Sequence, residues 1–363
     1  MGIAAASLAP SNGTDMQVPL IDISAWVGQG VASERRQVAR SVDDALRGSG
    51  FMQVVGHAIP DVVIADMVSA ADGFFALAPE AKTRYCVTGA NRGYTPPRSE
   101  ALSVSIGVEP EPGSKDYFEA FNVGVEGSSF AGLDLPEPEY AANAWPSEPE
   151  RFRAAVERYF AEAGRVARTL TTIFESALGE AQGFFDTLTD HSIDVLRLNN
   201  YALPDEAELG SATAMGAHTD FGIVTVLWAD QVPGLQLLDA DGVWHDVMPA
   251  DGALLVNIGD LTARLTNDVW MSTMHRVLPP RVDGRLVRRR SAAYFHDGNY
   301  DAVIATRPRF ENADGRAGYV PLTVREHLRV KLAGSRQGRP NTAAERDAAR
   351  LRPARTAARD QVR

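Results

Sequence analysis

The second half of this chain consists of short apolar runs, each separated from the next by turn-forming residues. Between residues 193 and 296 the runs are DVLRLNNYAL, GIVTVLWAD, GLQLLDADGVWHDV, ALLVNIG, TMHRVLP and RRRSAAYF. In the third run the pair Asp241-Gly242 favours a tight hairpin, because glycine tolerates the positive φ that such turns need. Several short strands in succession predict a β-sandwich or barrel.

The first half predicts helices and a few strands around this β-rich part. Strands are expected at VPLIDIS and FMQVVGH, and again at KDYFEAFNVG. Helices are expected over 33–50, from Pro60 onward and from about Glu150 to Leu178, where apolar residues recur at helical spacing. The Gly-, Pro- and Ser-rich segment 89–113 predicts a loop or irregular strands. This order indicates a mainly β fold with flanking helices (α+β), in which the long helix covers a sheet.

Charge and composition exclude several classes of protein. The net charge of −11 argues against a nucleic-acid partner, since neutralising phosphates requires a basic surface. The chain has one cysteine, Cys86, and lacks both a run of about 18 apolar residues and a secretory signal. We therefore expect a cytoplasmic protein that neither spans nor binds a membrane. Neither the substrate nor the oligomeric state is encoded in a recognisable motif.

The two ends of the chain differ from its middle. Residues 1–17 predict a disordered leader. From Ala333 to Arg363 eight arginines stand against three acidic residues, a net charge of +5. This basic tail is expected to be disordered or partly helical, outside the fold.

The segment AHTDFG presents two potential metal ligands two residues apart. If His218 and Asp220 lie on one extended strand, both side chains point to the same side of it. One further histidine would complete a facial triad, in which two imidazoles and one carboxylate bind Fe(II) and leave adjacent positions for reactants. His275, in STMHRVLP, is the favoured third ligand, and His245 and His296 are the alternatives.

The H-x-D pair by itself is weak evidence for a metal site. Many short segments in the same order identify a protein family much more specifically. Over 18–332 the chain resembles the isopenicillin N synthase-like family of Fe(II)/2-oxoglutarate oxygenases. The N-terminal segments that carry the resemblance are VPLIDIS, GFMQVVGHAIP, FFALAPEAK and RGYTP. The C-terminal segments are LRLNNYALP, AHTDFGIVTVLWADQVPGLQLLD, LLVNIGDL, HRVLPP, RRRSAAYF and YVPLTVREHL.

The resemblance implies a fold and a domain organisation. The fold is a double-stranded β-helix, a distorted jelly roll. Residues 18–332 would form a single catalytic domain and 333–363 the basic tail. Within that domain we expect an N-terminal helix-and-strand part over 18–125, the long helix within 150–180, and the jelly-roll core with the iron site over 193–310.

The resemblance also implies a binding site for 2-oxoglutarate. The N-x-Y element of the family corresponds to Asn199 and Tyr201, and its R-x-S element to Arg289 and Ser291. Arginine, serine and tyrosine would hold the distal carboxylate, which suits a guanidinium and hydroxyl donors chemically. The run 288–290 is all arginine, so the register is open by one residue, although strand alternation favours Arg289 on the face of the serine.

By the same resemblance the chain is expected to oxidise a C–H bond of a small molecule, using Fe(II), 2-oxoglutarate and O2. Hydroxylation, desaturation or cyclisation, in specialised metabolism, are the expected outcomes. Candidate residues of the substrate pocket are Tyr94, Phe118, Phe121 and Phe295. Three alternatives stay open: an iron oxidase that does not use 2-oxoglutarate, an enzyme of the ethylene-forming type that fragments 2-oxoglutarate, and a non-catalytic binding module.

Overall fold

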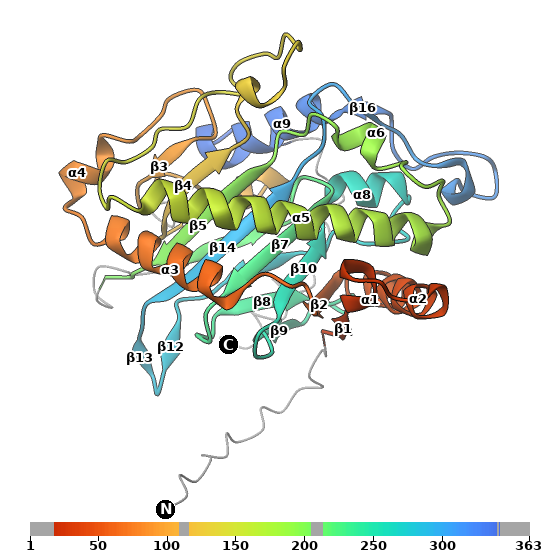
Figure 1. The fold of residues 1–363 in the computed structure, drawn as a ribbon, viewed down its shortest axis with the longest axis horizontal. Coiled ribbons are helices and arrows are strands. Elements are labelled where there is room, and N and C mark those ends of the chain that lie inside the picture. The colour runs from red at the N-terminus through yellow and green to blue at the C-terminus, as the bar shows by residue number, and fades with distance from the viewer. Residues whose placement is uncertain (1–17, 109–115, 205–212, 340, 342–363) are drawn as a thin grey trace, which may run out of the picture.

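Two β-sheets face each other at the centre of the molecule, and helices cover the outer face of the larger sheet (Figure 1). The computed structural model describes residues 18–108, 116–204, 213–339 and 341. The predicted leader 1–17 and most of the predicted basic tail lie outside the described residues. The facing sheets and their flanking helices form the jelly roll that the resemblance implies.

The larger sheet has eight strands and the smaller has four. In spatial order the larger contains β1 (Leu20–Asp22), β2 (Phe51–Val55), β10 (Leu254–Ile258), β7 (Val224–Ala229), β14 (Arg289–His296), β5 (Val195–Tyr201), β4 (Glu119–Gly124) and β3 (Gly93–Thr95). The smaller contains β6 (Met215–His218), β11 (His275–Val277), β8 (Leu235–Leu238) and β9 (Trp244–Asp246). Two further sheets have two strands each: the hairpin of β12 (Arg281–Val282) with β13 (Arg285–Leu286), and the pair of β15 (Val303–Ile304) with β16 (Leu322–Thr323).

The helices follow the apolar periodicity of the sequence. They are α1 (Ser24–Val27), α2 (Ala32–Gly48), α3 (Asp61–Phe75), α4 (Pro79–Thr83), α5 (Phe152–Leu178), α6 (Asp186–Thr189), α8 (Asp260–Leu265) and α9 (Val324–Gln337). Short 3-10 turns occupy η1 (Leu102–Ile106), η2 (Gly127–Ser129) and η3 (Pro308–Phe310). The strand β3 and the turn η1 form inside 89–113, which was expected to be irregular.

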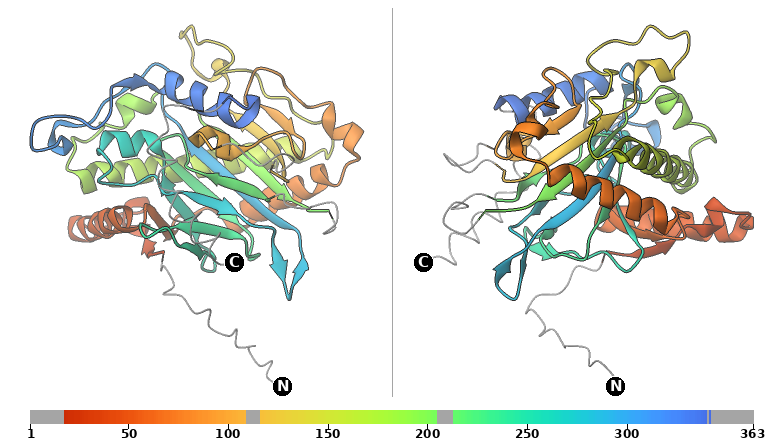
Figure 2. Two further views of the ribbon diagram at one scale, coloured as in Figure 1. Left: turned by 180° about the vertical axis from the view of Figure 1, so that it is seen from behind. Right: turned by 60° about the vertical axis from the view of Figure 1, so that its left-hand side comes forward.

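The long helix α5 packs across the outer face of the larger sheet (Figures 1 and 2). It ends at Gly179, which adopts φ 64° and closes the last turn. Gly164 lets the helix approach β14 closely, because a Cβ there would lie 2.6 Å from the hydroxyl oxygen of Tyr294. The helix begins within two residues of the position that the apolar periodicity predicted.

Strand alternation gives the larger sheet two chemically distinct faces. On β5, Leu196 and Leu198 belong to the core beneath α5, whereas Asn199 and Tyr201 face the smaller sheet. The hairpin predicted at Asp241-Gly242 joins β8 to β9, with Gly242 at φ 82°. The inner face of the larger sheet and the smaller sheet together enclose the polar residues discussed below.

The C-terminal helix α9 crosses the boundary that the sequence suggested at residue 332. It continues to Gln337, and Asn341 packs against η1, where its side-chain amide donates to the carbonyl oxygen of Ser105 at 3.0 Å. The first part of the predicted tail is thus folded against the catalytic core. None of the helices in the described part of the chain is both long and apolar enough to cross a bilayer.

Candidate metal centre and cosubstrate site

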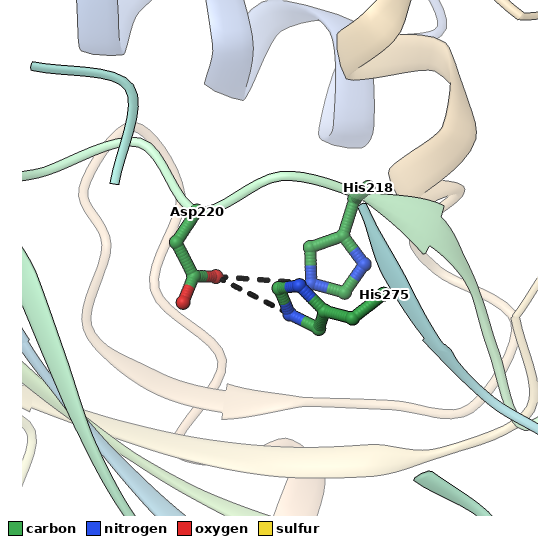
Figure 3. A group of neighbouring side chains, drawn as sticks. All are labelled: His218, Asp220 and His275. Atoms are coloured by element: carbon green, nitrogen blue, oxygen red, sulfur yellow. Dashed lines mark ion pairs between the residues drawn. The ribbon is translucent and has the colours of Figure 1, made fainter. Parts of the chain in front are cut away.

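His218, Asp220 and His275 converge between the two sheets (Figure 3). His218 is the last residue of β6 and His275 the first of β11, and the antiparallel register places the two directly opposite each other. Each of the three side chains offers one ligand atom, and these atoms all lie within 4.8 Å of one another. All three side chains are buried. Residues far apart in the sequence thus form one cluster of potential metal ligands.

His218 and Asp220 do not share one strand, which was the condition under which both side chains were expected to point to the same side of it. Strand β6 ends at His218, and Asp220 lies in the turn that follows it. The carbonyl oxygen of Asp220 accepts the backbone N–H of Asp260, at the start of α8, at 2.9 Å. The carboxylate reaches the two histidines because this contact holds the turn in place.

Both histidines present the same ring nitrogen to the centre of the cluster. Nδ1 of His218 lies 2.8 Å from the carbonyl oxygen of Gly216, and Nδ1 of His275 lies 3.1 Å from that of Thr273. A carbonyl only accepts, so each Nδ1 carries a proton, and Nε2 is the ring atom that could bind a metal ion. This arrangement orients both rings as metal ligands.

The two oxygens of the Asp220 carboxylate make different contacts. Oδ1 lies 3.6 Å from Nε2 of His275 and 3.9 Å from Nε2 of His218. Oδ2 accepts from the hydroxyl of Thr225 at 2.5 Å and from the side-chain amide of Asn257 at 2.6 Å. One oxygen is therefore anchored by the larger sheet, while the other is directed toward the imidazoles.

Electrostatics favour the neutral form of His218. Burial, together with the neighbouring His275, lowers the pKa of His218 to about 3, although Asp220 acts in the opposite direction. A neutral imidazole is the form that binds a metal ion. His218 is thus in the form that binds a metal ion at neutral pH.

The two alternative histidines lie elsewhere. His245, on the edge strand β9, pairs with Asp239 at 2.6 Å. His296, at the end of β14, pairs with Asp194 at 2.9 Å on the face of the sheet that α5 covers. Neither belongs to the cluster of His218, Asp220 and His275.

A second cluster of polar side chains lies on the inner face of β5 and β14. Its members are Asn199, Tyr201, Arg289 and Ser291. Ser291 is paired in register with Asn199, whose amide nitrogen lies 3.3 Å from the serine hydroxyl. The guanidinium of Arg289 lies 5.3 Å from the centre of the Tyr201 ring. The Tyr201 hydroxyl points to the sulfur of Met215 at 3.8 Å. This group is therefore connected to β6, the strand that ends at His218.

Arg289 is a buried cation with an unused donor. It is 2% exposed, and its Nε finds no acceptor among the described residues. Burial also raises the pKa of Tyr201, against the opposing charge of Arg289, so the tyrosine keeps its proton. A buried guanidinium beside hydroxyl donors is suited to a carboxylate, which the cosubstrate 2-oxoglutarate would supply.

The neighbouring arginines point to the other face of the sheet. Arg288 and Arg290 both pair with Asp72 of α3, each at 2.8 Å. Arg290 also contacts Asp230 at 3.1 Å. Side chains alternate between the two faces of β14, as expected from the sequence. Of the three arginines, only Arg289 therefore lies on the same face as Ser291.

The four aromatic candidates for a substrate pocket divide between the two faces. Phe118 lies on the inner side and packs near Tyr201, with ring centres 6.0 Å apart. Phe295 shares its face with Thr225, its partner in register. Tyr94 and Phe121 instead pack around Phe74 in the core beneath the helices. The alternation of β3 and β4 therefore directs Tyr94 and Phe121 to the face of the larger sheet that lies away from His218, Asp220 and His275.

Sequence reasoning missed the residues that hold Asp220. Thr225 and Asn257 each interrupt an otherwise apolar strand, in GIVTVLW and LLVNIG. A polar residue at a core position of a strand is unusual unless it has a specific partner. That signal was present in the sequence, although it does not name the partner.

Two family models match this chain. One, described as non-haem dioxygenase in morphine synthesis N-terminal, matches residues 18–148. The other, the 2OG-Fe(II) oxygenase superfamily, matches residues 193–298 and so includes the three clustered ligands and the Arg289–Ser291 pair.

Several relatives and solved structures align along most of their length. A 2-oxoglutarate-Fe(II) type oxidoreductase, hxnY, of Emericella nidulans is 32% identical over 86% of this chain and 88% of its own. The 2-oxoglutarate-dependent dioxygenase citB of Monascus ruber is 32% identical over 88% and 95%. A full-length Neurospora crassa protein, crystallised in complex with alpha-KG and thymine, superimposes with a TM-score of 0.77, at 25% identity over 89% of this chain and 98% of that one.

Proposed function

The chain belongs to the 2-oxoglutarate–Fe(II) oxygenase superfamily, and on that premise we propose that His218, Asp220 and His275 bind its iron while Arg289, Ser291, Tyr201 and Asn199 bind 2-oxoglutarate. The enzyme is a dioxygenase that uses Fe(II), 2-oxoglutarate and O2 to oxidise a small molecule. The reaction we propose is oxidation of an unactivated C–H bond, by hydroxylation, desaturation or cyclisation, in specialised metabolism.

The observation that carries the metal assignment is the geometry of the three ligand atoms. Two imidazole nitrogens and one carboxylate oxygen lie within 4.8 Å of one another, and each side chain has its other polar atom engaged by the protein. This donor set suits a non-haem ferrous ion, which needs one face of its coordination sphere for reactants.

The support for the cosubstrate assignment is the unpaired donor of Arg289. A buried guanidinium without an anion is costly, and the distal carboxylate of 2-oxoglutarate would remove that cost. Ser291 and the protonated Tyr201 would donate to the remaining lone pairs of that carboxylate.

Residues of this chain position the iron ligand and the substrate, while iron and 2-oxoglutarate supply the oxidising chemistry. When bound, iron and 2-oxoglutarate activate O2 and supply the oxidant that removes hydrogen from the substrate, while 2-oxoglutarate becomes succinate and CO2. Thr225 and Asn257 keep the Asp220 carboxylate in position. Phe118 and Phe295, on the inner face, would orient the substrate and exclude water from the centre.

We further propose a cytoplasmic enzyme with no nucleic-acid or membrane partner. The net charge of −11 and the single cysteine support this proposal. Relatives named for validamycin A and homoarginine, and a solved structure with thymine, indicate polar small molecules as a first substrate panel.

The decisive experiment measures succinate formation by the iron-loaded protein with 2-oxoglutarate, O2 and this panel. His218→Ala and Asp220→Ala should abolish both iron binding and succinate formation, because each removes a ligand. His245→Ala is the matched control and should retain both, since His245 pairs with Asp239 at the edge of the smaller sheet.

Other outcomes would contradict the proposal. Turnover without 2-oxoglutarate would indicate an iron oxidase, and release of ethylene would indicate fragmentation of the cosubstrate. Succinate formation that survives His218→Ala would contradict the metal assignment.

A further inference from the structure

A fully buried lysine lies beside the turn that carries Asp220. Lys331, on α9, is 2% exposed, and its ammonium group lies 2.7 Å from Oδ2 of Asp260. It also donates to the hydroxyl of Thr219 at 3.1 Å. A lysine is almost never fully buried unless its charge is paired, and here Asp260 provides the pairing charge.

The ammonium group of Lys331 touches both chain neighbours of Asp220. Thr219 precedes Asp220 and accepts the hydrogen bond. Phe221 follows Asp220, and the centre of its ring lies 5.5 Å from the lysine nitrogen. One cation from the far end of the sequence therefore contacts the turn on either side of the proposed iron ligand.

Asp260 forms a second connection from the lysine to the same turn. Its carboxylate pairs with Lys331, and His327 of α9 lies 3.2 Å from the same oxygen. Its backbone N–H donates to the carbonyl oxygen of Asp220 at 2.9 Å. The lysine thus restrains the turn directly through Thr219 and indirectly through Asp260.

The turn needs such a restraint because Asp220 is not part of a strand. Strand β6 ends at His218, so no ladder of strand hydrogen bonds fixes the next residues. Thr225 and Asn257 hold only the side chain of Asp220. The blue ribbon of α9 lies above the cluster in Figure 3.

We propose that Lys331 is a positioning residue for the metal centre: its ammonium group fixes the turn 219–221 and so directs the Asp220 carboxylate toward His218 and His275. The inference rests on the proposed metal-binding function. It assigns to the C-terminal helix a part in the iron site that the family motifs around the ligands do not include.

The test compares Lys331→Met with Leu328→Ala. Methionine keeps much of the volume of lysine and removes its charge, whereas Leu328, one turn earlier on α9, packs in the apolar core and has no polar side-chain group that could pair with Asp260. Fe(II) is titrated anaerobically into each protein with saturating 2-oxoglutarate, and the charge-transfer absorption of the complex gives the dissociation constant. The d–d spectrum of Co(II)-loaded protein reports ligand geometry.

We expect Lys331→Met to weaken Fe(II) binding about 10- to 100-fold, the range found when groups that orient metal ligands are removed, and to alter the Co(II) spectrum. Leu328→Ala should lower the melting temperature but keep Fe(II) affinity within about twofold. Lys331→Met combined with Asp260→Asn removes the buried carboxylate that has lost its lysine partner. This double variant should regain thermal stability while iron binding stays weak.

Two results would overturn the inference. One is an Fe(II) affinity of Lys331→Met equal to that of the wild type. The other is a loss of affinity that follows the melting temperature across all three variants, which would indicate a purely structural ion pair. A wild-type protein without the Fe(II)·2-oxoglutarate absorption would instead overturn the proposed function itself, and the inference with it.

Discussion

At the scale of single residues, the iron site depends on atoms that do not face the metal. Thr225 and Asn257 both donate to Oδ2 of Asp220, which leaves Oδ1 in a fixed direction. Thr225→Val removes one donor while keeping the shape, so we expect Fe(II) affinity to fall about 10-fold. Anaerobic titration of iron measures the change.

Thr171→Val is the matched control for that substitution. Thr171 is equally buried, but its hydroxyl donates to a carbonyl oxygen within α5. It should lose stability of about 1 kcal/mol and no iron affinity. Equal iron affinities of the two variants would refute a role for Thr225 in holding the ligand.

The pH dependence of the metal-free protein follows from His218. Its pKa is about 3 in the folded protein, because of burial and His275, and about 6.5 when unfolded. The unfolded chain therefore binds the extra proton below about pH 6.5. The contribution of neutral His218 is present above that pH and is lost as the pH falls toward 3. From about pH 7 to about pH 5 the loss should be about 2 kcal/mol.

Urea denaturation of the metal-free protein at about pH 7 and about pH 5 tests this prediction. His218→Gln cannot take up the proton, so its decrease in unfolding free energy over this range should be smaller by about 2 kcal/mol. The same pH dependence in both proteins would contradict the assignment of a low pKa to His218.

The sequence predicted the site residues that belong to local motifs, but not the residues that position them. H-x-D, N-x-Y and R-x-S are local patterns, and alternation along β14 separated Arg289 from its neighbours. Thr225, Asn257 and Lys331 act through partners 5 to 112 residues away. No local pattern specifies such partners, because they meet only after the sheets have packed.

At the scale of elements, β14 directs chemically identical residues to opposite faces. Arg289 faces the enclosed site, whereas Arg290 pairs with Asp72 and Asp230. We expect Arg289→Ala to raise the KM for 2-oxoglutarate about 100-fold or more, because it removes the partner of a buried carboxylate, at a cost of about 3–5 kcal/mol. Steady-state succinate formation measures it.

Arg290→Ala provides the comparison on the same strand. Its side chain is one-third exposed, so its ion pairs contribute at most about 1 kcal/mol, and the KM for 2-oxoglutarate should stay within about twofold. A rise in KM with Arg290→Ala and none with Arg289→Ala would show that the register of β14 has been assigned to the wrong face.

Local periodicity also predicted the elements themselves better than their ends. The spacing of apolar residues identified α5, and short apolar runs between turn-forming residues identified β5, β7 and β14. The end of β6 at His218 was missed; two residues further on, the carbonyl oxygen of Asp220 accepts the backbone N–H of Asp260 from a distant part of the sequence. The division of the aromatic candidates was missed as well, because Tyr94 and Phe121 take their face from pairing with neighbouring strands.

At the scale of the whole molecule, the catalytic core includes part of the segment expected to be a tail. Glu100 is 4% exposed and pairs with Arg197 of β5 at 2.7 Å and with Arg336 of α9 at 2.9 Å. The N–H of Ala101 donates to the carbonyl oxygen of Ser335 at 2.8 Å. Through Glu100 and Ala101, the C-terminal helix α9 is therefore connected to the inner face of the larger sheet.

Two shortened chains test this connection. A chain ending at residue 341 keeps these contacts and should melt at the temperature of the 363-residue chain. A chain ending at residue 332 leaves Glu100 with one of its two cations and leaves the N–H of Ala101 without its acceptor. We expect it to lose about 3 kcal/mol or more and to melt several degrees lower in a thermal scan. Equal melting temperatures would place the boundary of the folded core at residue 332 after all, because the contacts made beyond that residue would then contribute nothing to stability.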